Sequence, residues 1–444
     1  MSGISDTGIV AAAVLAVAGA LLLIFSAYGV PPMDDTYIHL VFGRNLMLSG
    51  QLEFNPGLPS SGATSPLWVA LSGPLALTGG QTAVTLLMVL SLIAGTISLL
   101  LAGSVYSSLL LLSGPLLFHG PSGMETSLAV LLVVIAWRSV SRSRPPGIGQ
   151  GLLLAAMLIT RPELCVIAIP LLFSAGRPDL AQTAKVLLPP AVVGILWVSW
   201  NVWASGCPLP SSFYAKQAGA VGFGLLAGLR GLCREMVIVS PLLGVTGLAG
   251  IYHLLRRKCP LGLFSLVPLT SLLLQPNSFF QMRYHVPGLV VLGLCAAGVS
   301  CSWKRWMRIL IVLSLLPGLL VFGSRRVRAS ANVLSIDTRP ALYLAEIAGQ
   351  GDTVAAADVG APGWLTDLYV IDLDGLVTPE RNPCRRVRGW SWIRERADYL
   401  LAFPEQYSDL LRNARPDLVH LRSFETEDNV ICGESRVGLW DVLP

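Results

Sequence analysis

Two adjacent carboxylates, Asp34 and Asp35, follow directly on the first apolar run of the sequence. One of them could take the proton of an attacking hydroxyl group, and either could bind a divalent cation. The alternative is a helix-capping pair at a membrane boundary. Asp35 could equally share metal or hydrogen-bond work with Asp34 or hold the start of a helix. Adjacent like charges raise the proton affinity of one member unless a cation offsets them.

Other charged residues lie at the ends of apolar runs. Glu125 lies in the first turn of one run, where a carboxylate stabilises the positive end of a helix. Arg161 and Glu163 could form an internal ion pair that closes a short hairpin. Both structural roles are compatible with lining a charged cavity.

Aromatic and histidine side chains near these positions are candidates for contacting a substrate. Trp68 and Tyr214 could stack on a sugar ring, although interfacial aromatic residues usually anchor a protein at lipid headgroups. Tyr37 belongs to the motif of the acidic pair, and His39, one helical turn beyond Asp35, faces either the same site or solvent. No His/Cys cluster has zinc spacing, so a metal at the acidic pair is expected to be Mg, Mn or Ca. The sequence leaves the need for a metal open.

The composition indicates the class of protein that holds these residues in place. The 444 residues are 53% hydrophobic and 13% charged, with a mean hydropathy of +0.65, which is typical of an integral membrane protein. Up to Gly323 the chain has 17 Lys/Arg and 8 Asp/Glu, whereas the remaining 121 residues have 14 and 18. We therefore predict a membrane domain over 1–323 and a soluble domain over 324–444. Nucleic acid binding is not expected, because no basic stripe with interleaved aromatic residues occurs.

Eleven apolar runs are candidate membrane spans: 9–30, 81–103, 108–121, 124–138, 148–160, 164–174, 186–205, 235–255, 261–280, 286–302 and 307–323. We predict a polytopic α-helical protein with about eleven transmembrane helices. The runs 148–160 and 164–174 are too short to cross about 30 Å of hydrocarbon, so the tip between them is expected in a water-filled cavity. The run 66–77 is predicted as an interfacial helix within a first outer loop at 31–80.

The basic residues of the connecting loops indicate the orientation. They all fall on one side: Arg138, Arg142, Arg144, Arg177, Lys185, Arg256, Arg257, Lys258, Lys304, Arg305 and Arg308. The positive-inside rule makes that side cytoplasmic, with a cytoplasmic N-terminus and an extracytoplasmic C-terminal domain. The first run has no cleavage site and is expected to be an uncleaved span.

Most acidic residues of the membrane domain then fall on the outer side. They are Asp34, Asp35, Glu53, Glu125, Glu163 and Glu235, joined there by Lys216, Arg283 and His285. Charges near a membrane are costly and mark substrate or ion pathways, so the functional site is expected at the outer face.

The C-terminal 121 residues have the pattern of a soluble α/β domain. Strands are predicted at 353–357, 368–373, 399–403, 418–421 and 437–442, and helices near 338–349 and 405–414. The segment from Asp358 to Gly363 superficially resembles a phosphate loop, but no Lys-Ser/Thr follows, so nucleotide binding is rejected. The domain is expected to cover the cavity and help hold an acceptor, with Asp358 and Asp374 as candidates to reach the site.

Cysteine positions suggest disulfides on the outer side. Cys384 and Cys432 are the only cysteines of the C-terminal domain, and we predict that they pair. Cys207 and Cys233 also fall on the outer side and could form a second bridge.

Short motifs along the chain resemble a known family. In order, they are Asp34-Asp35-x-Tyr37-Ile38, Phe54-Asn55-Pro56-Gly57, Thr64-Ser65-Pro66-Leu67-Trp68, Ser122-Gly123-Met124-Glu125-Thr126, Thr160-Arg161-Pro162-Glu163, Pro210-Ser211-Ser212-Phe213-Tyr214-Ala215-Lys216, Arg283-Tyr284-His285-Val286-Pro287, Asp358-Val359-Gly360-Ala361 and Asp372-Leu373-Asp374-Gly375-Leu376-Val377. Together they resemble the GT-C glycosyltransferases, in particular the bacterial group that includes mycobacterial terminal arabinofuranosyltransferases.

The resemblance implies an enzyme of the bacterial cytoplasmic membrane. It would move a sugar from a polyprenyl-phosphate donor to a glycan, lipid or protein acceptor at the outer face, for example an arabinofuranose in cell-envelope assembly. Asp34 resembles the catalytic acid of the first outer loop, and its action as general base implies inversion at the anomeric carbon. Lys216 and Arg283 first, then His285 and Arg161, are the candidates for the leaving phosphate. A monomer without a nucleotide cofactor is expected.

Two other classes of protein compete with this interpretation. A transporter or lipid flippase would also use charges near the membrane, but the hydropathy shows no internal repeat and the charges gather at one face. A non-catalytic scaffold that presents the outer domain would have a dispensable Asp34 loop.

Overall fold

The structure of the chain is a computed structural model that describes residues 6–25, 29–214, 225–275, 277, 279–382, 384 and 389–443. It divides into two compact units. Unit 1 comprises Met1–Leu23, Met88–Leu196 and Phe223–Arg325, and unit 2 comprises Ile24–Leu87, Trp197–Gly222 and Arg326–Pro444. The break after Arg325 lies close to the predicted domain boundary, but unit 2 also includes the first outer loop and the segment from Trp197.

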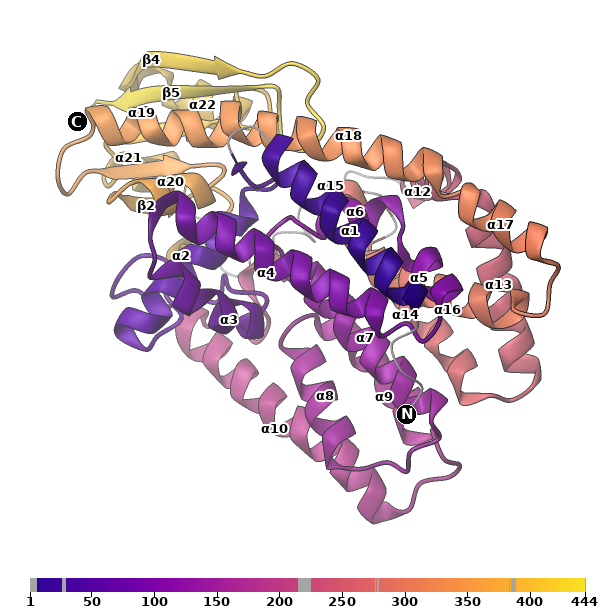
Figure 1. Ribbon diagram of the computed structural model, residues 1–444. Coiled ribbons are helices and arrows are strands. Elements are labelled where there is room, and N and C mark those ends of the chain that lie inside the picture. Colours follow the sequence, from indigo (N-terminus) through magenta and orange to yellow (C-terminus); the bar gives the residue numbers. More distant parts are fainter. Residues whose placement is uncertain are drawn as a thin grey trace. The chain divides into compact units, whose positions relative to one another are not determined.

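Unit 1 is helical (Figure 1). Its elements, of which α1, α4, α10 and α18 cross the unit boundaries, are α1 (Asp6–Phe25), α4 (Gly80–Leu100), α5 (Val105–Leu111), α6 (Gly114–His119), α7 (Thr126–Ser141), α8 (Ile148–Leu158), η2 (Pro162–Ile167), α9 (Ala168–Leu172), α10 (Leu180–Ser205), α12 (Leu225–Val239), α13 (Pro241–Arg256), η3 (Pro260–Ser265), α14 (Leu266–Leu274), α15 (Phe279–Met282), α16 (Val286–Ser300), α17 (Arg305–Leu313) and α18 (Leu316–Val333).

Three described helices are long and apolar enough to cross a membrane: Gly80–Leu100, Leu180–Ser205 and the continuous stretch Arg305–Ile347. A fourth candidate is the pair Leu226–Val239 and Pro241–Arg256, bent by 103° at its break. Shorter apolar helices include Thr126–Ser141, Ile148–Leu158 and Val286–Ser300. The chain is thus a membrane protein with helices in the predicted runs, whereas the count of eleven spans stays a prediction.

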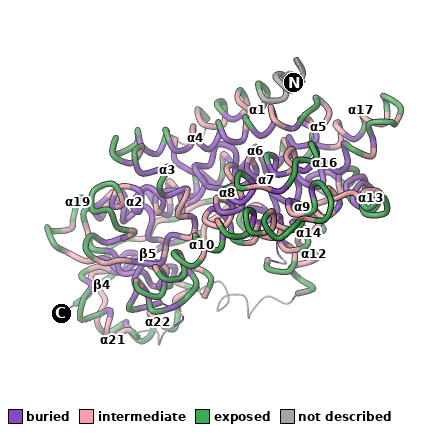
Figure 2. Tube along the Cα trace, turned by 90° about the horizontal axis from the view of Figure 1, so that it is seen from below, coloured by how far each residue is buried: buried purple, intermediate pink, exposed green. Residues whose placement is uncertain are grey.

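Burial separates central from peripheral helices within unit 1. Nearly every residue of α16 is buried, and α13 packs closely against it because glycine leaves room: a Cβ on Gly247 would lie 2.9 Å from the Leu292 carbonyl oxygen. In α17 only Ile311 is buried, and Figure 2 shows the rest of that helix in the colours of exposed and intermediate residues. Exposed apolar residues such as Leu188 and Ile195 on α10 are those expected to contact lipid.

Unit 2 is an α/β unit. Its elements are α2 (Asp35–Ser49), α3 (Pro66–Ala76), η4 (Leu334–Thr338), α19 (Arg339–Ile347), β1 (Thr353–Ala356), α20 (Gly360–Leu365), β2 (Tyr369–Asp372), η5 (Pro379–Arg381), α21 (Trp390–Arg394), β3 (Tyr399–Ala402), α22 (Ser408–Ala414), η6 (Arg415–Asp417), β4 (Leu418–Glu425) and β5 (Arg436–Val442).

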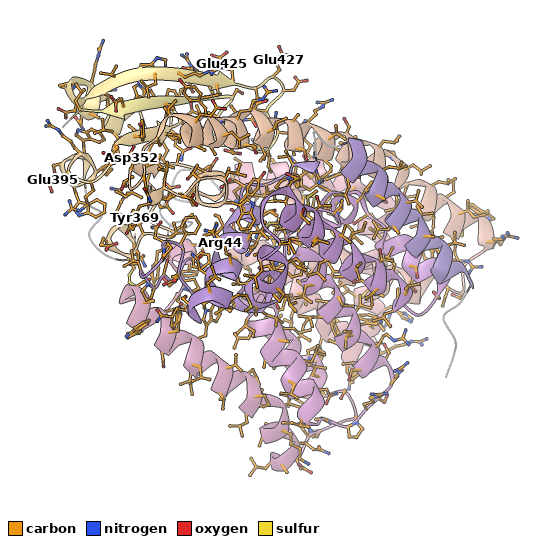
Figure 3. All side chains as sticks on the ribbon, turned by 60° about the vertical axis from the view of Figure 1, so that its left-hand side comes forward. Arg44, Asp352, Tyr369, Glu395, Glu425 and Glu427 are labelled. Carbon is orange, nitrogen blue, oxygen red and sulfur yellow. A yellow bond between two sulfur atoms is a disulfide. The ribbon has the colours of Figure 1, made fainter. Side chains whose placement is uncertain are left out.

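The strands form one mixed sheet in the order β2-β1-β3-β5-β4. β1 pairs in parallel with β2 and β3, whereas β5 is antiparallel to β3 and β4. The central strands are short buried apolar runs, and the edge strand β4 is exposed and charged, which discourages pairing with another chain. Glu425 at the end of β4, labelled in Figure 3, pairs with Arg436 at 3.4 Å. The predicted small C-terminal sheet is confirmed, while the short helices α20 and α21 were not predicted.

The cysteines of unit 2 pair differently from the prediction. Cys384 forms a disulfide with Cys207, with the two Cα atoms 6.6 Å apart, and Cys432 is a free thiol. Asn429 holds the Cys432 backbone in a tight turn between β4 and β5, and the Cys432 thiol contacts Asp337 at 3.9 Å. Cys233 is also free and exposed. Cys384 is thus in a disulfide, but its partner is Cys207 and not the predicted Cys432.

Candidate functional site

The carboxylate of Asp34 is held by the backbone of the C-terminal segment. Asp34 precedes α2, but its side chain makes no capping hydrogen bond to that helix. Its two oxygens instead accept hydrogen bonds from the N–H groups of Gly360, at 2.6 Å, and Ala361, at 2.7 Å. These N–H groups open α20, where a helix has unpaired donors and a partial positive charge. The capping interpretation of Asp34 is therefore not what the structure shows.

Contacts between α2 and α20 fix this arrangement. The two helices pack together within unit 2, and the Arg44 guanidinium of α2, labelled in Figure 3, lies 5.4 Å from the centre of the Trp364 ring of α20. Gly363 of α20 leaves room for the Phe54 ring of the first outer loop. The first outer loop and the segment after β1 thus form one packed layer around Asp34.

Gly360 has no room for a side chain. A Cβ at this position would press on the Asp34 carbonyl oxygen and lie 2.5 Å from its carboxylate oxygen. We expect Gly360→Ala to displace Asp34, to lower the unfolding free energy by about 1–3 kcal/mol and to reduce the activity expected from the motifs at least tenfold. Initial rates and thermal unfolding of the purified protein measure both effects. Gly389→Ala is the matched control, because a Cβ there meets open space, and equal behaviour of the two variants would contradict the positioning role.

More acidic groups surround Asp34. Asp337 lies in η4, a π-helical turn, and shares a hydrogen bond with Asp358, which follows β1. Two carboxylates can share a hydrogen bond only if one of them carries a proton. Burial raises the pKa of Asp358 to about 7. Burial and then the charge of Asp358 also raise the pKa of Asp34 well above its usual value, against the lowering effect of the Gly360 and Ala361 N–H groups.

These pKa shifts are useful for proton transfer. A general base works best when its pKa lies near the working pH, because it is then both ionised and basic. Asp34 has a raised pKa, two fixed hydrogen bonds and a partly exposed side chain. The arrangement can therefore accept a proton from a bound hydroxyl group.

Asp358→Asn should shift the pH dependence of the protein. Because the Asp358 charge raises the pKa of Asp34, its removal should move the acid limb of the rate profile to lower pH. The pKa of Asp358 is higher in the folded protein than in the unfolded chain. Its protonated form therefore favours folding at a pH below its unfolded-state pKa, and this contribution is lost as the pH rises towards 7, where the buried carboxyl group ionises. The variant should therefore unfold at a higher temperature than the wild type at pH 8. Rate profiles and melting curves from pH 5 to 8 test both, with the exposed Asp409→Asn as control.

The other candidates of the first outer loop are mostly buried within unit 2. Tyr37 is buried and its hydroxyl group lies 3.2 Å from Thr338 Oγ1. Trp68 and His39 are also buried, with 1% and 5% of their surface exposed, so neither is a surface anchor. Asp35 is partly exposed at the first position of α2.

Tyr214 is the last described residue before Lys216, a predicted ligand of the donor phosphate. The Tyr214 hydroxyl oxygen accepts a hydrogen bond from the Leu209 N–H at 3.4 Å. Lys216 lies outside the described residues. Asp374 is exposed and accepts a hydrogen bond from the Tyr407 hydroxyl group at 2.7 Å.

Two polar residues that were not predicted as site residues, Asn55 and Ser211, connect distant segments of unit 2. The Asn55 side chain exchanges two hydrogen bonds with the Val370 backbone, at 2.8 and 2.9 Å, and so continues the edge of β2. Ser211 bonds to Ser61 at 2.7 Å and accepts from Asn382 at 3.0 Å. Both residues belong to the motifs that resemble the glycosyltransferase family, and membership of these motifs is the sequence feature that marks them. Their contacts indicate that they position the loop.

Unit 1 contains a second buried charged cluster. The Glu125 carboxylate accepts hydrogen bonds from Arg161, at 2.9 Å, and from Arg283, at 3.0 Å, with all three side chains at least nine-tenths buried. Arg161 also pairs with Glu163 at 3.3 Å, as the sequence suggested. Both guanidinium groups lie close to the Tyr284 ring, at 5.2 and 5.8 Å.

Three motifs far apart in sequence thus meet at Glu125. Glu125 is the N-cap residue of α7, as expected for an acid at a helix start, but its side chain makes no capping hydrogen bond to that helix. His285 lies at the start of α16, and its Nε2 is 2.7 Å from the Asn277 carbonyl oxygen. Glu235 pairs with Arg325 at 2.6 Å.

Solved structures share the fold of the chain. The structure of ArnT from Cupriavidus metallidurans bound to undecaprenyl phosphate matches with a TM-score of 0.56 at 12% identity, covering 98% of each chain. The oligosaccharyltransferase of Archaeoglobus fulgidus, in complex with Zn and sulfate, matches with a TM-score of 0.56 at 13% identity, covering 87% of this chain and 67% of its own. The chain has a GT-C-like fold. This agrees with the fold class predicted from the motifs, while the count of eleven spans and the likeness to arabinofuranosyltransferases stay predictions.

Sequence comparison adds one local match. Residues 328–439 match a domain of unknown function, DUF8728. This range covers most of the C-terminal part of unit 2, including Asp358 and Gly360. No curated protein sequence matches the chain at a significant level.

Proposed function

We propose that the protein is a membrane glycosyltransferase that moves a sugar from a polyprenyl-phosphate donor to an acceptor hydroxyl group. The observation that supports it most is the Asp34 carboxylate, fixed by the N–H groups of Gly360 and Ala361 within a GT-C-like fold. The likeness to ArnT, whose structure holds undecaprenyl phosphate, supports the choice of donor.

In the proposed reaction the acceptor oxygen attacks the anomeric carbon of the donor. Asp34 takes the hydroxyl proton as the new glycosidic bond forms. The bond between the anomeric carbon and the phosphate oxygen breaks, and polyprenyl phosphate leaves from the opposite face with the electron pair. A single displacement inverts the anomeric centre.

The leaving phosphate gains negative charge and needs fixed cations. Arg161 and Arg283 are the proposed ones in unit 1, where Glu125 holds both guanidinium groups in place. Lys216 and His285 complete the proposed set. The carboxylates near Asp34 are ligands that Mg, Mn or Ca accepts, and a metal requirement is part of the proposal to be tested.

We further propose that the reaction takes place at the outer face of the bacterial cytoplasmic membrane, in cell-envelope assembly, by a monomer. The motifs favour an arabinofuranose as the sugar, and the acceptor is a glycan, a lipid or a protein.

The test is sugar transfer by the purified full-length protein. Polyprenyl phosphates that carry labelled arabinofuranose or hexoses are offered with a synthetic glycan acceptor, with and without EDTA. The proposal expects labelled product and free polyprenyl phosphate in equal amounts from at least one donor. Movement of a fluorescent donor across vesicles without any transfer would instead support a flippase.

A further inference from the structure

A cavity in unit 1 lies apart from the residues of the proposed reaction. Its volume is about 720 Å³. It is lined by the end of α7, the loop that follows and the start of α8, two helices that pack side by side (Figure 1). None of the candidate site residues lines it.

Three arginines form one part of the cavity wall: Arg138, Arg142 and Arg144. Arg138 is fixed by a 2.7 Å hydrogen bond from its guanidinium to the Leu101 carbonyl oxygen. No acidic residue lines the cavity, and the sequence has none between Glu125 and Glu163. Within the part of the chain that the structure describes, none of the three forms an ion pair, so their positive charge is not neutralised there.

Other residues of the wall are apolar. Ile135 of α7 and Leu152 of α8 line it, with 37% and 60% of their surface exposed. Both belong to apolar helices of a membrane protein, where exposed aliphatic side chains contact lipid chains. The lining therefore combines cationic and exposed aliphatic side chains.

The loop between the helices is held in a defined shape. The Gly147 N–H donates to Gln150 Oε1 at 2.8 Å, and the Gln150 amide donates to Ser139 Oγ at 3.1 Å. The Ser174 hydroxyl group donates to the Arg144 carbonyl oxygen at 2.6 Å. Gln150 is buried, and these bonds fix the shape of the loop that lines the cavity.

We propose that this cavity binds an anionic phospholipid of the leaflet that surrounds the α7–α8 loop. The lipid phosphate contacts the three arginines, and an acyl chain lies along Ile135 and Leu152. Basic pockets between membrane helices recognise anionic headgroups through such charge complementarity. A free phosphate would match the arginines but not the apolar wall, which favours the lipid. The inference does not depend on transferase activity.

Native mass spectrometry of the full-length protein in detergent tests the proposal. Phosphatidylglycerol, which is anionic, should bind at least tenfold more tightly than zwitterionic phosphatidylcholine. Arg142→Gln with Arg144→Gln should weaken phosphatidylglycerol binding about 25-fold, at roughly fivefold for each arginine. Arg256→Gln with Arg257→Gln removes the same charge from another exposed loop of unit 1 and should change binding less than twofold. Equal loss in both double variants, or no preference between the lipids, would overturn the proposal.

A second variant tests the shape of the cavity at constant charge. Gly149 lines the cavity near the start of α8, and a Cβ there meets no atom within 4 Å, so Gly149→Leu is expected to occupy part of the cavity. It should weaken phosphatidylglycerol binding at least tenfold with unchanged thermal unfolding. Unchanged lipid binding in this variant, or equal displacement of the lipid by inorganic phosphate at the same concentration, would show that the arginines bind only anions at the surface. This variant decides the question if the arginine variants fail to fold.

Discussion

Asp34→Asn is expected to reduce sugar transfer by about two to four orders of magnitude, the usual contribution of a positioned general base. The asparagine side-chain amide cannot take the proton of the acceptor hydroxyl group at neutral pH. It also has one acceptor oxygen for the two N–H groups of Gly360 and Ala361, so one donor loses its partner at a cost of about 1–3 kcal/mol. Transfer rates and melting temperatures must therefore be measured on the same preparation.

The matched control is Asp409→Asn. Its side chain is 91% exposed and pairs only weakly with Arg412, so both rate and stability should stay at wild-type values. Binding of the polyprenyl-phosphate donor should persist in Asp34→Asn. A transfer rate within a few-fold of the wild-type rate would show that Asp34 is not the base. If the activity falls only in proportion to the fraction of unfolded protein, the role of Asp34 is structural.

Glu125→Gln is expected to cause the largest loss of stability. It leaves two buried guanidinium groups, those of Arg161 and Arg283, without their shared counter-charge. Breaking a buried ion pair by removing one partner costs about 3–5 kcal/mol, because the remaining charge stays desolvated. Thermal unfolding of the purified protein in detergent measures this loss.

Glu163→Gln makes the same chemical change next to the same arginine. The Glu163 side chain is 19% exposed and lies 3.3 Å from Arg161, compared with 4% exposure for Glu125. Its replacement should cost under about 1 kcal/mol. Similar melting temperatures for the two variants would mean that the cluster is hydrated and contributes little to stability.

Local patterns predicted much of the fold. The five strands of the C-terminal sheet and helices in the apolar runs lie where hydropathy and alternation placed them, because both signals report burial of a regular element. The helix α20 escaped prediction, since its six residues include two glycines and a proline and carry no periodicity. Its position depends on packing against α2 rather than on propensity.

Contacts between distant segments could not be predicted. The sequence identified Asp34 and Asp358 separately, but their approach is a tertiary contact across more than three hundred residues. The same limit explains the cysteines: Cys207 and Cys384 are 177 residues apart, and compartment alone favoured the nearer partner. Glu125, Arg161 and Arg283 were each identified as site candidates, whereas their junction in one cluster was visible only in the structure.

Unit 2 is built from three separate stretches of the chain, and this affects how the protein matures during synthesis. The first outer loop leaves the ribosome early, but the Gly360 N–H that binds Asp34 is made 326 residues later. Until then the loop has no partner for this carboxylate, and such long-range contacts form slowly. A nascent or truncated chain that has not reached α20 would therefore be inserted but inert, so the proposed enzyme becomes active only after α20 has been made.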